Sequence, residues 1–328
     1  MIQISEDFIK KNISYPELRN ALKLAFREGM IQCPPKLAYD YKNGVGSEDN
    51  TLLFMPAWDN KKYMGIKLIT ATPHNSIVDI PYLNGLYVLF NAENGMPIAA
   101  MDAKLITNMR TAATSVLATT FLAKENASSV LILGNGSLSP YYISAYASME
   151  GIKKIYVWGR NFDKSKKVVA SLNLPNSVEI KAVSSYKDLV SSVEIVSCIT
   201  SSYVPLLNID DISIGQHFDL AGSYTADMQE VSTDVVARSS VFTDNYDVTL
   251  EHAGELVKAF AEDKLSRSDI KGDFITLCKD DSSKRLAHDE ITLCKCTGMA
   301  FEDFVFATLI YQKHLEQIRK IGDEIVIN

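Results

Sequence analysis

Long apolar runs are missing from this chain, which has no stretch of about 18 consecutive apolar residues. Its start, MIQISEDFIKKNIS, also lacks a basic segment followed by an apolar one. A membrane span needs about 20 apolar residues, and an export signal needs a basic start with an apolar centre. We therefore expect a cytoplasmic protein without a membrane partner.

Cysteine, histidine and excess basic charge are scarce as well. The five cysteines are an odd number without a disulfide spacing, so we expect free thiols in a reducing compartment. The five histidines show no zinc-binding spacing, so we expect no metal site. With 33 Lys and Arg against 40 Asp and Glu, and no basic block, nucleic acid is not an expected partner. An acidic chain that binds acidic ligands must gather its cations in a pocket.

The 328 residues are enough for two domains, and the first part of the chain predicts a mixed α+β arrangement. Residues 14–27 have helical spacing behind a serine suited to an N-cap, and residues 108–124 predict an Ala-rich helix. Strand-like segments lie at residues 37–41, 51–58, 64–70 and 86–102, the last with a hairpin turn at 93–95.

From residue 128 the pattern changes to strands that alternate with helices. Residues 128–134, SSVLILG, form a continuous apolar run, which is typical of a parallel strand buried on both faces. A helix is predicted at 138–150 and a second strand at 153–159. Similar strands are predicted at residues 178–184, 193–200, 216–222 and 239–244. This alternation predicts an α/β fold with a doubly wound parallel sheet, and the amphipathic segment 298–320 is expected to return to the first domain.

A glycine-containing turn follows the first of these strands and predicts a dinucleotide site. Its sequence is Gly134-Asn135-Gly136-Ser137-Leu138-Ser139, directly before a helix. The two glycines let the backbone approach a pyrophosphate, which the helix N-terminus stabilises. The third glycine of the usual fingerprint is replaced by Ser139, and a plain tight turn is the alternative. We predict cofactor contacts from Gly134, Gly136, Ser137 and Leu138 of this Rossmann-type motif.

The end of the second strand indicates which nicotinamide cofactor binds. Its sequence is Trp158-Gly159-Arg160-Asn161, and no carboxylate appears before Asp163. An acidic residue there would bind the ribose hydroxyl of NAD, whereas an arginine suits the 2′-phosphate of NADP. We predict NADPH, read by Arg160 and Asn161 with Lys164 or Ser165 as helpers. NADH binding, with Arg160 as a solvated surface residue, is the alternative.

Two cations occur in unusual places in the first part of the chain. Lys67 lies inside the apolar strand at 64–70, and Arg110 lies at the start of the Ala-rich helix. Together they could hold a substrate carboxylate, with Arg110 in bidentate fashion. The alternative is that both face solvent, since strand residues alternate between faces.

Five segments of the chain, in the same order, resemble the ornithine cyclodeaminase/mu-crystallin family. They lie at residues 55–67, 101–118, 131–139, 222–231 and 297–303, so the resemblance spans nearly the whole chain. RTAA at 110–113 and GMAFED at 298–303 are the most specific. The resemblance implies a Rossmann dinucleotide-binding domain, residues 124–300, inserted in a mixed α+β domain for substrate binding and dimerisation, residues 1–123 and 301–328. We also expect a homodimer or a higher even oligomer formed through the first domain, because the strand-like segments between residues 37 and 102 are too many for its few helices to cover.

The resemblance implies roles for single residues as well. In the family an arginine, a lysine and a second arginine hold the carboxylate of an amino or imino acid. The last two match Lys67 and Arg110, and the first falls on Lys36, where bidentate geometry is lost but charge is kept. The positions that the family places near the cofactor are Thr111, Thr200, Ser201, Gly222 and Met299. Asp303 either contributes to the site or caps or pairs within the last helix, and we favour the second.

Tyr224 marks a departure from the cyclodeaminases. They carry an aspartate at this position, which handles the substrate amine, whereas GSYTADMQEV resembles the branch that reduces cyclic ketimines. We therefore expect NAD(P)H-dependent reduction of Δ1-pyrroline-2-carboxylate or Δ1-piperideine-2-carboxylate to proline or pipecolate. Tyr224 or Lys67, or a water that they hold, would supply the proton; loop packing is the other role open to Tyr224. Alternatives are an ornithine cyclodeaminase, an amino-acid dehydrogenase, an enzyme that makes N-linked amino acids, or a mu-crystallin-like binding protein without turnover.

Overall fold

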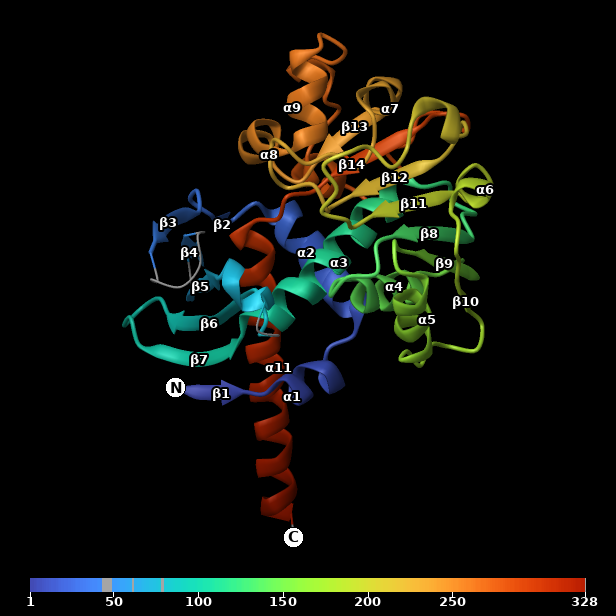
Figure 1. Ribbon diagram of the computed structural model, residues 1–328. Coiled ribbons are helices and arrows are strands. Elements are labelled where there is room, and N and C mark those ends of the chain that lie inside the picture. The colour runs from blue at the N-terminus through green and yellow to red at the C-terminus, as the bar shows by residue number, and fades with distance from the viewer. Residues whose placement is uncertain (43–48, 61, 78–79, 328) are drawn as a thin grey trace. The chain divides into compact units, whose positions relative to one another are not determined.

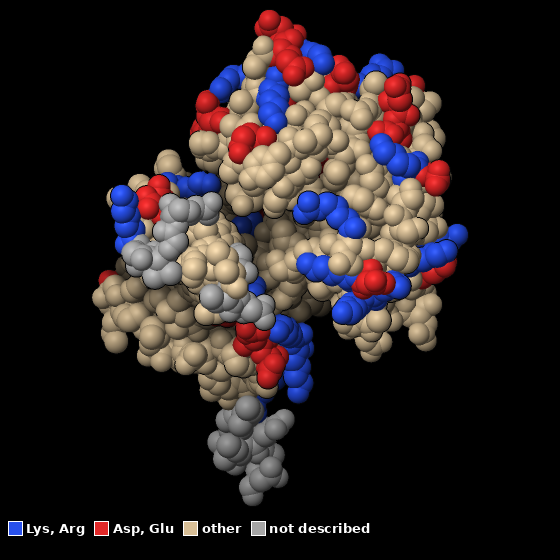
Figure 2. All heavy atoms as spheres, viewed as in Figure 1, with Lys and Arg blue, Asp and Glu red and all other residues tan. Residues whose placement is uncertain are grey.

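The computed structural model describes residues 1–42, 49–60, 62–77 and 80–327. The chain divides into two compact units. The first unit consists of residues 1–110 and 299–328, and the second of residues 111–298. The boundary at residue 110 falls inside one continuous helix, α3 (Ala103–Leu122). On the face of the molecule that Figure 2 shows, acidic and basic side chains lie next to one another.

The first unit is built on a mostly antiparallel sheet of order β1-β7-β6-β5-β4-β2, with β3 paired to β4 (Figure 1). Its strands are β1 (Ile2–Ile4), β2 (Ile31–Gln32), β3 (Leu37–Tyr41), β4 (Asn50–Asp59), β5 (Tyr63–Ala71), β6 (Leu83–Asn91) and β7 (Pro97–Asp102). Its helices are α1 (Glu6–Asn12), α2 (Tyr15–Glu28), the start of α3 and α11 (Ala300–Ile327), with a 3-10 turn at Pro73–Ile77. The long helix α11 contacts α2 and strands β4, β5 and β6.

Local sequence explains two of these elements. Ser14 and Glu17 form a reciprocal capping box at the start of α2, which confirms the helix predicted from residue 14. The β6–β7 hairpin is also confirmed. Its turn uses the Asn91 side chain, which accepts from the backbone N–H of Glu93, and Gly95 has a φ of 71°.

Helix α3 begins at Ala103, five residues before the predicted start at 108. The carboxylate of Asp102 accepts from the backbone N–H of Leu105 at 2.5 Å and so serves the free N–H groups of the first turn. Arg110 therefore lies two turns inside the helix rather than at its start. None of the described helices is long and apolar enough to cross a bilayer.

The second unit contains a parallel sheet of order β10-β9-β8-β11-β12-β14-β13, which confirms the predicted doubly wound α/β fold. Its strands are β8 (Ser129–Leu133), β9 (Lys154–Trp158), β10 (Glu179–Ala182), β11 (Ile195–Cys198), β12 (His217–Leu220), β13 (Ser240–Thr243) and β14 (Thr292–Lys295). Its helices are α4 (Ser139–Ala147), α5 (Phe162–Ala170), α6 (Lys187–Val190), α7 (Thr233–Arg238), α8 (Tyr246–His252), α9 (Gly254–Ala261) and α10 (Phe274–Cys278). Short 3-10 turns lie at Ile209–Asp211 and Arg267–Asp269. The central strands β11, β12 and β14 are buried along their whole length.

Candidate active site

The turn after β8 has the geometry of a phosphate-binding turn. Gly134 has a φ of 132°, and a Cβ there would lie 2.7 Å from the Ile199 side chain and 3.0 Å from the Ile199 carbonyl oxygen. Only glycine fits this position without strain. At Gly136 a Cβ would meet nothing within 4 Å, so the backbone there is open to a ligand. Helix α4 begins at Ser139, directly behind the turn.

A cleft of about 500 Å³ lies at the carboxyl ends of β8, β9 and β11. This volume is typical of small-molecule sites, and ligands of open α/β sheets bind at this edge. The cleft is lined by Gly134, Asn135, Gly136, Trp158, Gly159, Arg160, Lys164, Ile199, Thr200, Ser201, Ser202, Tyr203, Val204 and Leu206. The lining holds two cations, Arg160 and Lys164, and no carboxylate. Its electrostatic character therefore favours an anion.

The loop that carries Arg160 is fixed by its neighbours. Asn161 caps α5 through its side-chain oxygen, which accepts from the backbone N–H of Lys164 at 2.9 Å. Asn135, from the glycine turn, donates to the carbonyl oxygen of Asn161 at 2.8 Å and to the hydroxyl of Ser165 at 3.0 Å. Asp163, the carboxylate nearest in sequence, pairs instead with Lys166 at 2.6 Å. The exposed Arg160 forms no ion pair with any residue that the structure describes.

The first unit holds a buried group of charges, which we call the charge cluster: Lys67, Arg110, Glu302 and Asp303. Lys67 is 3% exposed and Arg110 is 5% exposed, so neither faces solvent. Asp303 binds both: one oxygen lies 2.6 Å from the Lys67 ammonium, and the other accepts from Arg110 Nε at 2.9 Å. Glu302 lies 3.5 Å from Arg110 Nη1. The cluster brings together the two predicted carboxylate-binding cations, already paired with two internal carboxylates.

The charge cluster is buried and has a polar neighbour, Tyr87. Burial lowers the pKa of Lys67, and the charge of Asp303 opposes this shift. Tyr87 lies directly opposite Lys67 in the β5–β6 register, and burial raises the pKa of its phenol well above the usual value. Its buried hydroxyl has no hydrogen-bond partner among the described residues. Since buried polar groups are nearly always hydrogen-bonded, this hydroxyl marks the surroundings of the charge cluster as a candidate ligand site.

The other predicted site residues fall into two groups. Thr200 and Ser201 line the cleft with the glycine turn, and the N–H of Gly222 donates to Glu230 at 2.9 Å. Outside the cleft lining and the charge cluster are Lys36, which is exposed, Tyr224, which is 46% exposed, and the predicted cofactor residues Ser137, Leu138, Thr111 and Met299. Ser137 is exposed, and Leu138, Thr111 and Met299 are half-buried.

Several residues of these sites did not emerge from the sequence as site residues. Asp303 was expected to serve mainly the last helix, and Glu302 and Tyr87 were not singled out. For the charge cluster, the available signal was the alternation of buried and half-buried residues along β5. This alternation places Lys67 on the same buried face as Tyr63 and Ile69. Glu230 drew attention only as part of the GSYTADMQEV segment. Among the described residues, no three His, Cys, Asp or Glu side chains are grouped to hold a metal ion.

Comparisons with known proteins agree on one family. The family model of the ornithine cyclodeaminase/mu-crystallin family matches residues 2–317. A Delta(1)-pyrroline-2-carboxylate reductase of Colwellia psychrerythraea is 32% identical over 94% of this chain and 98% of its own. A Delta(1)-pyrroline-2-carboxylate reductase of Paracoccus denitrificans is 30% identical over 81% of this chain and 84% of its own. The solved Thermococcus litoralis Delta(1)-pyrroline-2-carboxylate reductase, in complex with NADH and L-proline, has a TM-score of 0.87 and 25% identity, covering 97% of this chain and 98% of its own.

Removal of Asp303 should destabilise the fold strongly. Asp303→Ala leaves Lys67 and Arg110 buried with one carboxylate between them, which should lower the free energy of unfolding by about 3–5 kcal/mol. The measurement is urea unfolding at neutral pH. Asp163→Ala is the control, because it breaks the exposed pair with Lys166, which should contribute at most about 1 kcal/mol. Equal losses in both variants would contradict a tightly coupled cluster.

Proposed function

The chain belongs to the ornithine cyclodeaminase/mu-crystallin family, and we propose that it is a nicotinamide-dependent oxidoreductase that reduces a small cyclic ketimine carboxylate. The product would be the corresponding cyclic amino acid, proline from the five-membered ring or pipecolate from the six-membered ring. The observation that carries the proposal is the charge cluster, because it brings together the two cations expected to bind the substrate carboxylate. The names of the reductases similar to this chain support the same chemistry.

The second unit would hold the cofactor and the first unit the substrate. The residues present fit a dinucleotide: the glycine turn provides an open backbone and a helix N-terminus, and the cleft is lined by cations without a carboxylate. When bound, the reduced nicotinamide supplies the hydride. We propose NADPH as the preferred cofactor because Arg160 and Lys164 suit a 2′-phosphate, with NADH as the alternative that the Thermococcus litoralis structure contains.

The charges of the first unit fit a protonated ketimine. The charges of Lys67, Arg110, Glu302 and Asp303 sum to zero. The site therefore stays neutral only if the ligand that enters it has a net charge of zero. A protonated ketimine carboxylate is such a ligand. Lys67 and Arg110 would bind its carboxylate, with Lys36 as a third cation, and the internal carboxylates would balance the iminium. Lys67 is the stronger candidate for proton donor because burial weakens its hold on the proton, and Tyr224 is the second candidate.

A homodimer is the third part of the proposal, because the sheet of the first unit has a second apolar face. The register places its side chains on the face opposite Lys67 and Tyr87. These residues are Leu37, Tyr39, Leu52, Phe54, Pro56, Trp58, Met64, Ile66, Leu68, Leu86, Val88 and Phe90. A contiguous apolar face of this extent marks an interaction surface, and a second copy is the commonest partner.

Substitution on this face should yield a monomer. Met64 and Leu86 are 38% and 41% exposed, so Met64→Glu/Leu86→Glu should dissociate the dimer with little direct cost to the fold of the monomer. Sedimentation at micromolar concentration is the measurement. Ile214→Glu, at a 65% exposed position of the second unit, is the control and should remain dimeric. A monomeric wild type would contradict the proposal.

Arg160→Asp should change the cofactor preference. The loss of a charge-assisted contact should weaken NADPH relative to NADH by about 1–3 kcal/mol. The measurement is the KM for each cofactor, with Arg238→Asp as the control because Arg238 is exposed and outside the cleft lining. Equal changes in both KM values would rule out Arg160 as the residue that distinguishes the cofactors.

Arg110→Ala should nearly abolish ketimine reduction while NADPH affinity is retained. The loss of one cation should lower kcat/KM by about two to three orders of magnitude. Arg110→Lys keeps the charge and the partner of Asp303, so it should retain more activity and more stability. The measurement is NADPH oxidation with five- and six-membered cyclic ketimines, beside fluorescence titration of NADPH.

The same assays separate the alternatives. Tyr224 stands where a cyclodeaminase has an aspartate, so wild type should release little ammonia from ornithine, and Tyr224→Asp should slow reduction less than Arg110→Ala does. Strong ornithine-dependent ammonia release would favour a cyclodeaminase. Tight cofactor binding without turnover of any imine would favour a binding protein.

A further inference from the structure

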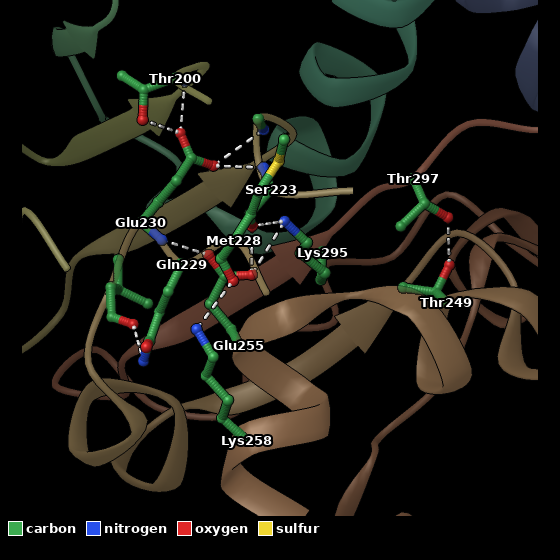
Figure 3. Close-up of polar contacts among 12 residues, drawn as sticks. Thr200, Ser223, Met228, Gln229, Glu230, Thr249, Glu255, Lys258, Lys295 and Thr297 are labelled. Carbon is green, nitrogen blue, oxygen red and sulfur yellow. Dashed lines mark hydrogen bonds and ion pairs between the residues drawn. The ribbon is translucent and has the colours of Figure 1, made fainter. Parts of the chain in front are cut away.

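The loops that follow β11 and β12 are tied together by one buried side chain, Glu230 (Figure 3). One carboxylate oxygen accepts from the backbone N–H of Thr200 at 2.5 Å and from its hydroxyl at 2.8 Å. The other accepts from the N–H groups of Gly222 at 2.9 Å and Ser223 at 3.2 Å. Four donors from two loops therefore converge on one carboxylate, and only an ionised carboxyl group can accept from all of them.

A second layer of buried charges holds Glu230 in place. Its backbone N–H donates to Glu255 at 2.6 Å, and Glu255 lies 3.1 Å from the Lys295 ammonium. Lys295 donates to the Ser223 hydroxyl at 2.5 Å, and that hydroxyl also donates to Glu255. Glu255 comes from α9 and Lys295 from β14 (Figure 3). Two further elements of the unit thus fix the position of the Glu230 carboxylate.

The two loops approach each other closely at Gly222. A Cβ at this position would collide with the backbone of Thr200 and with the Glu230 carboxylate. Thr200 continues into Ser201 and Ser202, and all three residues line the cleft. The segment that Glu230 fixes is therefore a wall of the cleft.

We propose that Glu230 is a positioning residue for the nicotinamide dinucleotide, which holds Thr200–Ser202 against Gly222–Ser223 and so maintains the wall of the cleft. This inference rests on the proposed function, because it takes the cleft as the cofactor site. Glu230 acts through the loops and does not line the cleft itself. Glutamine in its place would turn an amide N–H toward donor groups, which should separate the loops while the volume of the side chain is kept.

Protonation of Glu230 should have the same effect as the amide, because it turns an accepting oxygen into a donor. Burial raises the pKa of Glu230 to about 7, with Glu255 adding to the shift and Lys295 opposing it. Besides these two, Cys198 of β11 faces Glu230; burial raises the pKa of its thiol well above the usual value and the Glu230 charge adds to this shift, so the thiol stays neutral. Cofactor affinity should rise as the pH increases through about 7.

Folding stability should change in the opposite direction. The pKa of Glu230 is raised from 4.5 to about 7, so its contribution to stability is complete below 4.5 and is lost as the pH rises through this window. A residue with a merely structural role would not make cofactor binding stronger while the fold becomes weaker. The two trends together are the signature of a carboxylate whose ionised form organises the cleft at a cost to the stability of the fold.

The test is fluorescence titration of NADH into wild type, Glu230→Gln and a matched control, Glu194→Gln. NADH is the probe because it lacks the 2′-phosphate, which itself titrates near about pH 6. Glu194 also accepts from two backbone N–H groups, those of Ser128 and Ser129, but at the amino end of β8, the opposite edge of the same sheet. Urea unfolding of all three proteins establishes that they fold. If Glu230→Gln does not fold, Glu230→Asp, which keeps an ionisable carboxyl group, is used in its place.

We expect Glu230→Gln to weaken NADH binding about 10-fold or more above pH 7, and Glu194→Gln to leave the Kd unchanged. Wild type and Glu194→Gln should bind NADH more weakly below pH 7, whereas Glu230→Gln should show no such dependence. Glu230→Asp should bind weakly but keep the dependence. Equal Kd values in the two amide variants, or an unchanged pH profile in Glu230→Gln, would overturn the role of Glu230. Failure of wild type to bind either reduced cofactor would contradict the proposed function instead.

Discussion

The architecture of the first unit depends on one carboxylate, that of Asp303. Lys67 on β5 and Arg110 on α3 are both buried, and the cost of burying an ammonium and a guanidinium is several kcal/mol each unless an anion meets them. Asp303 contacts both cations, and it is supplied by α11, nearly two hundred residues after Arg110. The C-terminal helix must therefore pack on the sheet formed by the start of the chain. The ion pairs of Asp303 thus connect the two chain segments that form this unit.

In the second unit, the backbone N–H groups that follow the strands are treated in two different ways. The N–H groups after β11 and β12 are served internally by Glu230, which acts as a built-in anion. The turn after β8 contains no carboxylate, and its glycines leave the backbone open at Gly136. An external phosphate would be repelled where the internal carboxylate lies and accepted at the glycine turn. The same sheet edge thus offers an anion one open strand end, and the neighbouring loop Thr200–Ser202 forms a wall of the cleft.

Local sequence patterns predicted the fold well. Contacts between residues that lie far apart in the sequence could not be predicted from it. Continuous apolar runs and a glycine turn identified the parallel sheet, because both signals are local. Lys67 was recognised inside a strand, but the alternation of side chains along a strand does not tell which of the two faces of the sheet is buried. Its partner Asp303 lies in a first helical turn, where an acidic residue more often serves the helix itself.

Strand β14 was missed for a related reason. Its sequence, Thr292-Leu293-Cys294-Lys295, holds a lysine that is 0% exposed, and a buried lysine makes sense only beside Glu255, a contact that no local pattern reveals. Glu230 was hidden in the same way, since a lone glutamate in a loop reads as a surface residue until four donors are found around it. Functional sites are where local rules are broken and a distant residue compensates.

Charge balance also bears on which chemistry the proposed site favours. The four residues of the charge cluster, without the exposed Lys36, are neutral before any ligand arrives, so a carboxylate bound by Lys67 and Arg110 alone would leave a buried negative charge, whereas an iminium carboxylate would not. Protonation of the imine also makes its carbon electrophilic, so the reaction needs orientation and a hydride more than a strong base. The aspartate that handles the amine in cyclodeaminases corresponds to Tyr224 in this chain, which cannot serve as a carboxylate base. Charge neutrality of the cluster therefore agrees with the proposed reduction of a protonated ketimine, whose own net charge is zero.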